Sequence, residues 1–288
     1  MKKFICTVAS LALLMGCSVE GTVQPPTKPE EVAVPSGELE VHFIDVGQGD
    51  STYIKTPAGD DIVIDAGTAS SGKVVVDYLK GQQVDDIEVL IATHPDADHI
   101  GGLAEVLAAY DVEAVYAPKV SHTTDTYKNF LLAVKAEGVT IKAVKAGMKL
   151  PLQDVTAQFL GPVGDYGKDL NAWSAVLHVT HGETSFIFTA DAEGKAEGDM
   201  VSSGQSLKAD VYKVGHHGSD TSSSASFLKA VNPTYAVISA GEGNRYGHPT
   251  PSTLDKLKKA GIKTYRTDQQ GNVIATSNGK TIVFQTER

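Results

Sequence analysis

The stretch ATHPDADHIGG (residues 92–102) decides how the rest of this 288-residue chain is interpreted. It carries four candidate metal ligands within six positions, namely His94, Asp96, Asp98 and His99. The apolar run IEVLIAT before it predicts a buried strand, and the segment after it has an apolar helical face. Side chains two apart on an extended segment point the same way, so His94 and Asp96 can share one cation. Asp98 and His99 lie at the predicted helix start and can turn to a second cation.

Polar residues also follow other predicted strands. DIVIDAG contains Asp65, TSFIFTAD ends with Asp191, ADVYKVGHH ends with His216 and His217, and His248 follows TYAVISAG. Loops at strand ends are where rigid scaffolds present catalytic groups. Carboxylates and imidazoles that converge there suit a divalent cation. The sequence therefore predicts a metal site built from several strand ends.

The N-terminus has a different character from the rest of the chain. MKKFICTVASLALLMGCS has two lysines, an apolar run and small residues before Cys17, which is typical of a secretory signal. Its ending, LLMGC, resembles the lipobox of bacterial lipoproteins. We therefore expect residues 1–17 to be a lipoprotein signal with a lipidated Cys17, and an extracytoplasmic protein anchored to a bacterial membrane. A plain secretion signal is the alternative.

One domain is expected after this signal. Residues 18–37 carry four prolines and predict an extended tether, which leaves residues 38–288 as the domain. The chain has two cysteines, Cys6 and Cys17, so the mature domain is expected to have no disulfide. Past the N-terminus, no apolar run approaches the roughly 18 residues typical of a membrane span.

The net charge argues against a broad nucleic-acid-binding surface. It is −10 for the whole chain, and −10 − 2 = −12 once the signal and its two lysines are removed. Phosphate contacts need Lys and Arg, so a strongly acidic domain is a poor general binder of nucleic acid. Local basic residues could still line one face: Lys208, Lys213, Arg245, Lys256, Lys258, Lys259 and Arg266.

The distribution of strands and helices predicts the fold class. Strand-like runs dominate both halves of the domain, and amphipathic helices are interleaved with them. Two strand-rich blocks, each with its own helices, are expected to pack sheet on sheet with the helices outside.

Several motifs together resemble one protein family. THPDADHIGG resembles the His-x-His-x-Asp-His loop of the metallo-β-lactamase superfamily, with Asp96 in place of a histidine. FIDVGQGDS, IVIDAG, NAWS, FTADAE, VGHHGSDTSSS and NRYGHP recur in the same order in one subgroup, the soluble domain of the ComEC-type competence DNA-uptake protein and its stand-alone relatives. The resemblance covers roughly residues 39–275 and implies a four-layer αββα sandwich.

The resemblance also implies a two-metal site. His94 and Asp96 would bind the first cation, Asp98 and His99 the second, and Asp191 would bridge both. Two cations held in this way activate a water for hydrolysis. Asp98 or Asp191 would orient that water.

The histidine pair leaves a choice. One of His216 and His217 would complete the second site, and adjacent residues at a strand end point opposite ways. His216 is the favoured ligand, and His217 is expected to contact a substrate phosphate. His217 or His248 would donate a hydrogen bond or a proton to the leaving oxygen. Asp65 would orient the ligands.

The chain departs from the family pattern at the first metal site. Asn171 and Ser174 stand where many members have a further histidine ligand, and they are expected to contact substrate or a metal-bound water. Ser219 is another candidate substrate contact. His178 and His181 are interpreted as strand residues rather than substitute ligands. With Asp96 and Asn171 the first site is oxygen-rich, which makes it the weaker one and shifts its preference from Zn²⁺ toward Mn²⁺ or Mg²⁺.

A metal-dependent hydrolase is the function these features predict. A phosphodiesterase or nuclease is favoured, with DNA among its candidate substrates. The alternative is an extracytoplasmic hydrolase of a small phosphoester, a teichoic-acid phosphodiester, or a carboxyl ester or lactone. A non-enzymatic, lipid-anchored binding module is the third hypothesis. Hydrolysis of β-lactams is disfavoured because the closer motif matches lie elsewhere in the superfamily.

Overall fold

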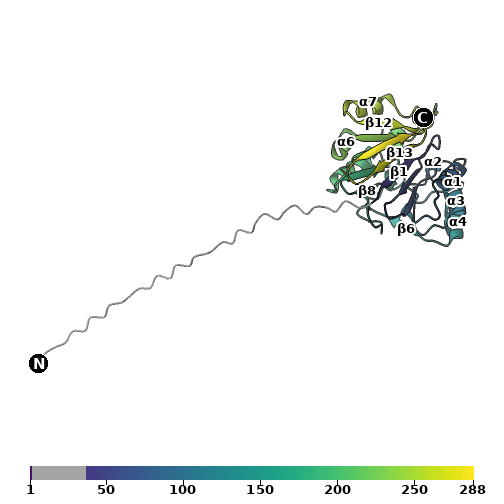
Figure 1. The fold of residues 1–288 in the computed structure, drawn as a ribbon, viewed down its shortest axis with the longest axis horizontal. Coiled ribbons are helices and arrows are strands. Elements are labelled where there is room, and N and C mark those ends of the chain that lie inside the picture. Colours follow the sequence, from purple (N-terminus) through teal and green to yellow (C-terminus); the bar gives the residue numbers. More distant parts are fainter. Residues whose placement is uncertain (2–36) are drawn as a thin grey trace. The chain divides into compact units, whose positions relative to one another are not determined.

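The computed structural model describes Met1 and residues 37–288 of the chain. The predicted lipoprotein signal, the lipidation of Cys17 and the tether up to residue 36 lie outside these residues and stay predictions. Within the described residues, no helix combines the length and apolar character needed to cross a membrane. Figure 1 shows the strands and helices, coloured from purple near residue 37 to yellow at the C-terminus.

The first sheet has eight strands in the order β14-β13-β1-β2-β3-β4-β5-β6. Their bounds are β1 Leu39–Phe43, β2 Thr52–Lys55, β3 Asp61–Ile64, β4 Val89–Ile91, β5 Val115–Pro118, β6 Ile141–Val144, β13 Val273–Ser277 and β14 Ile282–Thr286. Neighbours from β14 to β3 are antiparallel, whereas those from β3 to β6 are parallel. The parallel half needs crossover connections, which the helical segments between its strands provide.

The second sheet has six strands in the order β12-β11-β10-β9-β8-β7. Their bounds are β7 Thr156–Phe159, β8 Leu177–His181, β9 Thr184–Phe188, β10 Val211–Lys213, β11 Tyr235–Ile238 and β12 Lys263–Arg266. This sheet is also divided, with antiparallel pairing from β7 to β9 and parallel pairing from β9 to β12.

Helices lie on the outer side of each sheet (Figure 1). Those of the first half are α1 Gly72–Gly81, α2 Ala97–Ile100, α3 Leu103–Ala109 and α4 Asp125–Glu137. Those of the second half are α5 Gly194–Ser202, α6 Ala225–Val231, α7 Pro251–Lys259 and α8 Thr267–Gln270, with short 3-10 turns η1 Asn171–Trp173 and η2 Gly215–Gly218.

Three apolar clusters fill the spaces between these layers. The central cluster joins the two sheets and includes Phe43 and Phe186. A second cluster packs helices such as α4, through Phe130, against the first sheet. A third packs α6, through Phe227, against the second sheet. The predicted αββα sandwich is confirmed.

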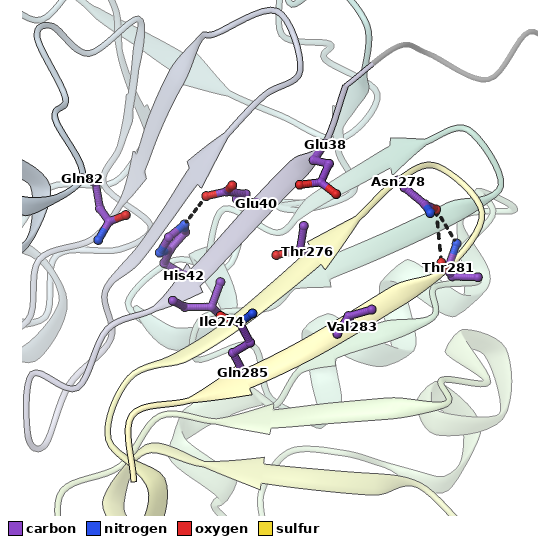
Figure 2. A pocket seen from close by; sticks show the side chains of 10 residues that line it. All are labelled: Glu38, Glu40, His42, Gln82, Ile274, Thr276, Asn278, Thr281, Val283 and Gln285. Carbon is purple, nitrogen blue, oxygen red and sulfur yellow. Dashed lines mark hydrogen bonds and ion pairs between the residues drawn. The ribbon is translucent and has the colours of Figure 1, made fainter.

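Strand β1 shows how the sequence pattern assigns its two faces. Leu39, Val41 and Phe43 point into the central cluster, while Glu40 and the buried His42 alternate with them on the outer face of the sheet. On that outer face lies a polar hollow of about 480 Å³, shown in Figure 2. It is lined by Glu38, Glu40, His42, Gln82, Ile274, Thr276, Asn278, Thr281, Val283 and Gln285. None of the predicted site residues lines it.

Candidate metal centre

The predicted site residues converge from the carboxyl ends of parallel strands. Asp65 follows β3 and His94 follows β4, while Asp191 follows β9 and η2 follows β10. Strands β3 and β4 are parallel neighbours, as are β9 and β10, so their ends meet at the same edge of each sheet. The two sheets together bring these loops to one place.

Asp191 lies at the centre of the site. Its Oδ1 is 3.1 Å from His99 Nε2 and 3.8 Å from His217 Nε2. Its Oδ2 is 3.8 Å from His94 Nε2 and 3.6 Å from His216 Nε2. Each carboxylate oxygen therefore faces its own pair of imidazoles, which is the arrangement a residue that bridges two cations requires.

Two further carboxylates divide the site into two clusters. Asp98 Oδ2 lies 3.3 Å from His217 Nε2, and Asp96 Oδ2 lies 3.6 Å from His94 Nε2. We call Asp98, His99 and His217 the inner cluster, and His94, Asp96 and His216 the outer cluster; Asp191 belongs to both. Among residues 37–288, three groups have ligand atoms close enough to hold one ion, all within 4.8 Å of one another: His94–His99–Asp191, Asp98–His99–His217 and Asp50–Asp191–His217. The first of these groups takes ligands from both clusters.

Unpaired buried atoms support a cation site. The Nε2 atoms of His94, His99 and His217 and the Oδ1 atom of Asp191 are buried without a hydrogen-bond partner among the described residues. Buried polar atoms in folded proteins nearly always have partners. Carboxylate and imidazole donors that converge without one fit a divalent cation of the Zn²⁺ or Mn²⁺ type.

Asp65 braces the inner cluster. Its Oδ2 is 2.8 Å from His99 Nδ1, so the imidazole presents Nε2 to Asp191. Thr93 fixes the carboxylate in turn, because its backbone N–H donates to Oδ1 at 2.9 Å and its hydroxyl to Oδ2 at 2.5 Å. A carboxylate behind a ligand histidine fixes the tautomer and ring orientation. This is the placement that the predicted orienting role of Asp65 requires.

Asp50 braces the same cluster from the other side. Its Oδ1 lies 3.2 Å from His217 Nδ1, and Lys213 Nζ donates to its two oxygens at 2.9 and 2.8 Å. Burial would raise the pKa of Asp50, but the Lys213 ammonium and the His217 imidazole outweigh burial and hold that pKa well below its usual range. Lys213 was expected among the residues that could line a basic face, and this was wrong because it is buried against Asp50.

Glu193 braces the outer cluster. Its Oε1 lies 2.8 Å from His216 Nδ1 and accepts hydrogen bonds from Asn171 Nδ2 at 3.3 Å and Thr221 Oγ1 at 2.9 Å. Asn171 thus reaches the site through Glu193. The sequence interpretation missed both Glu193 and Asp50. The available signals were an acid two residues after Asp191 and an acid in the loop after the first strand.

The histidine pair is arranged differently from the expectation. His217, not His216, lies beside Asp98 and faces the inner cluster, while His216 faces the outer one. Both residues have left-handed backbone conformations, with φ of 48° and 51°. The expectation treated them as strand residues pointing opposite ways. The left-handed turn instead places them on the two sides of Asp191, so each can serve a different cation.

Three residues predicted to contact substrate or donate a proton lie close to the metal centre or pack beside it. Ser174 is buried and its Oγ accepts the Asp191 N–H at 3.2 Å, so it fixes the backbone of the bridging residue. Ser219 is buried and its Oγ lies 2.8 Å from Thr221 Oγ1. His248 lies beside the outer cluster, with its ring centroid 5.4 Å from that of His216, and burial lowers its pKa.

The strand histidines lie elsewhere. His178 Nε2 is 2.8 Å from the Lys208 carbonyl oxygen, and His181 Nδ1 is 3.2 Å from Ser277 Oγ on the neighbouring sheet. Neither belongs to a cluster that could hold an ion in the described part of the chain. This agrees with their interpretation as strand residues.

The carboxylates around the inner cluster raise the pKa values of its two histidines. Burial lowers the pKa of His217, but Asp191 and Asp50 outweigh it and raise that pKa to about 10. Burial also lowers the pKa of His99, and Asp191 and Asp65 raise it well above its usual value. These imidazoles therefore hold protons that a divalent cation would displace.

The comparisons with known proteins agree with the fold and the clusters. Residues 44–242 match the family model of the Metallo-beta-lactamase superfamily, and the chain belongs to that superfamily. Its fold and its candidate metal clusters are those of a metal-dependent hydrolase.

Two curated relatives are similar to this chain over most of its length. The chain is 34% identical over 255 residues to ComE operon protein 3 of Bacillus subtilis, covering 83% of this chain and 33% of that protein. It is 34% identical over 241 residues to Competence protein ComA of Neisseria gonorrhoeae, covering 83% of this chain and 32% of that protein. The chain thus spans a third of the length of these relatives. The predicted resemblance to the competence-type subgroup is confirmed.

A solved structure shares the fold alone. The metallo-beta-lactamase fold protein YhfI from Bacillus subtilis superimposes with a TM-score of 0.55 at 12% identity, covering 84% of this chain and 100% of that one.

Proposed function

We propose that this chain is a two-metal phosphodiesterase that cleaves DNA strands. The observation that carries the proposal is the position of Asp191, whose two oxygens each face a separate pair of histidines. Two divalent cations held there would polarise a phosphoryl oxygen and lower the pKa of an attacking water. In this proposal Asp98, His99 and His217 would hold one cation, His94, Asp96 and His216 would hold the other, and Asp191 would serve both.

The chain's own residues would position the substrate and its leaving group. Asp65 and Asp50 keep the inner histidines in the tautomer that presents Nε2 to the ion. His248, whose pKa burial lowers, is the candidate donor of a hydrogen bond to the leaving oxygen. Arg245 is exposed in the loop that also carries His248, and it is available to attract a phosphate.

The donor set and the relatives support a phosphodiester substrate. Asp96, Asp98 and Asp191 supply three carboxylates, which suit Mn²⁺ or Mg²⁺ as well as Zn²⁺. One of the two relatives described above bears the name of a competence protein, Competence protein ComA. By contrast, the net charge of −10 disfavours broad contact with DNA. It therefore favours the second candidate function, hydrolysis of a small extracytoplasmic ester or a teichoic-acid phosphodiester.

Metal loading with separate substrates tests the proposal. The purified chain would be stripped with a chelator, reloaded with Mn²⁺ or Zn²⁺, and incubated with linear single- and double-stranded DNA and with bis(p-nitrophenyl) phosphate. We expect cleavage of DNA and of the small diester with at least one metal. Hydrolysis of the small diester without DNA cleavage would favour the second candidate. Absence of bound metal and of all turnover would favour a binding module.

The membrane location is a separate proposal that rests on the sequence alone. We propose that Cys17 is lipidated and holds the domain outside a bacterial membrane. Labelling with a fatty-acid analogue in a bacterial host tests it, with Cys17→Ser as the matched variant. Equal labelling of both proteins would contradict the proposal.

A further inference from the structure

A second hollow is linked to the metal centre through two of the residues that line it, Val120 and Trp173. It measures about 870 Å³ and is bounded by the loop after β5 and the loop that leads into η1. Its size is typical of a ligand pocket. Val120 lines this hollow and also a small apolar one that His94 touches. Trp173 lines it too, and the next residue, Ser174, accepts the Asp191 N–H. The hollow is therefore connected to the metal centre through Val120 and through the chain step from Trp173 to Ser174.

Trp173 is the single tryptophan of the chain and is only partly buried. Its Nε1–H donates to the Gly167 carbonyl oxygen at 3.1 Å. Its ring meets the Tyr166 ring edge to face, with centroids 5.9 Å apart and planes at 87°. The indole is thus held in one orientation while part of its surface stays accessible. A fixed aromatic surface of this kind is a platform on which a planar base can stack.

Cationic side chains share the hollow with this ring. Lys119 and Lys168 are both exposed, and His122 is half-buried beside them. The one carboxylate of the lining, Asp165, accepts the Gly167 N–H at 2.9 Å. In a chain of net charge −10, a hollow with two lysines and one acid is a local reversal of sign. Ammonium groups next to a stacking surface match an anionic backbone that carries planar bases.

We propose that this hollow, the Trp173 groove, is the subsite that binds a single nucleic-acid strand next to the metal centre. One base stacks on Trp173, and Lys119 and Lys168 bind the flanking phosphates. The proposal rests on the proposed phosphodiesterase function and narrows its substrate class. Teichoic acids and other sugar phosphates have no planar base, so the groove distinguishes nucleic acid from them. It also shows how an acidic protein can bind a strand without a broad basic face.

The single tryptophan makes binding directly measurable. The full chain in chelator, which prevents cleavage, would be titrated with a short single-stranded oligonucleotide while tryptophan fluorescence is recorded. An abasic strand of equal length and inorganic polyphosphate serve as controls. We expect the oligonucleotide to quench the fluorescence and both controls to leave it nearly unchanged. No quenching by the oligonucleotide, or equal quenching by the abasic strand, overturns the proposal.

Substitutions test the groove during turnover. Trp173→Leu keeps the apolar bulk and removes the ring, and we expect KM for a single strand to rise roughly 5- to 150-fold, the effect of losing one stacked base. The kcat for the strand and the kcat/KM for bis(p-nitrophenyl) phosphate should change less than about twofold, because the metal centre is intact. Trp173→Phe, which keeps a smaller ring, should recover part of the affinity. Equal losses on both substrates would show a purely structural role and overturn the proposal.

Lysine variants separate the phosphate contacts from general charge. Lys168→Ala should lower the salt dependence of strand binding by roughly one phosphate contact. Lys80→Ala removes an exposed lysine in the last turn of α1 and should leave that salt dependence unchanged. Equal effects of the two variants would contradict a specific contact. If the wild-type chain hydrolyses neither substrate, the proposed function fails, and the fluorescence titration still decides whether the groove binds a strand.

Discussion

The two clusters around Asp191 differ in how tightly the fold holds them. In the inner cluster, the side chains of His99 and His217 are 0% and 2% exposed and are braced by the buried carboxylates of Asp65 and Asp50, and Asp98 is 31% exposed. In the outer cluster, His94 is 0% exposed, whereas Asp96 and His216 are 37% and 25% exposed. Glu193, which braces His216, is itself 31% exposed.

Burial and bracing of the ligands should determine how tightly each cluster binds its cation. Ligands that are already oriented lose little conformational freedom when an ion arrives, and a dry site strengthens each charge contact. Exposed ligands must be ordered by the ion itself. We therefore expect one tightly held cation in the inner cluster and one weaker, exchangeable cation in the outer cluster.

Removal of the bridge should have the largest effect. Asp191→Asn takes a charge from both clusters, so we expect loss of both cations and at least about a hundredfold loss of activity. Metal content by elemental analysis and turnover of the small diester measure the two effects. Asp255→Asn, on an exposed face of α7, is the matched control and should change neither. Retention of two cations per chain would remove the bridging role.

The histidine pair tests the division between the clusters. His217→Ala should abolish tight metal binding because it opens the inner cluster. His216→Ala should leave one tight cation and remove the weak one. Titration of the chelated protein with Mn²⁺, followed by electron paramagnetic resonance, counts both kinds of site. The reverse result, with tight binding lost in His216→Ala alone, would restore the assignment expected from the sequence.

Asp50 tests whether bracing raises affinity. Asp50→Asn should weaken the tight cation about 10- to 100-fold, because His217 loses the carboxylate behind its Nδ1. It should also destabilise the fold by about 3–5 kcal/mol, because Lys213 is left as an unpaired buried charge. Thermal unfolding and Mn²⁺ affinity are measured separately. A double variant, Asp50→Asn with Lys213→Met, should recover most of the stability and little of the affinity. Recovery of both together would assign Asp50 a structural role alone.

Protons compete with the cation for the histidines of the inner cluster, so its metal affinity should depend on pH. The raised pKa values of His99 and His217 mean that both are protonated near neutral pH in the ion-free fold. A cation must displace these protons, so the affinity of the inner cluster should fall as pH falls, by up to about tenfold per pH unit for each proton displaced. Calorimetry in buffers of different ionisation enthalpy counts the protons released. An affinity independent of pH between 6 and 8 would show that the histidines bind no protons.

The parts of this centre that were predictable from sequence share a physical reason. The αββα layers follow from alternating and continuous apolar runs, and the loop at 92–102 carries its ligands within one turn of chain. These features are local. The bracing residues are not: Asp50 meets Lys213 across 163 positions, a contact that only the packing of one sheet on the other creates.

The histidine pair illustrates a second limit. Its orientation depends on two left-handed residues in succession, a conformation uncommon outside glycine. Nothing in the letters GHHG separates this turn from a strand end. The assignment of His216 and His217 therefore needed the backbone itself.

Substitution of Glu193 should have the smallest effect on metal affinity. Glu193→Gln keeps the size of the side chain and its hydrogen bonds to Asn171 and Thr221 but removes the charge behind His216 Nδ1. Because both partners are partly in water, we expect only a few-fold loss of affinity for the weak cation, with the tight cation unchanged. Competition between Mn²⁺ and a fluorescent chelator resolves changes of this size. A loss as large as that of Asp50→Asn would mean that exposure does not weaken bracing, and the ranking of the two clusters would then have to rest on ligand identity instead.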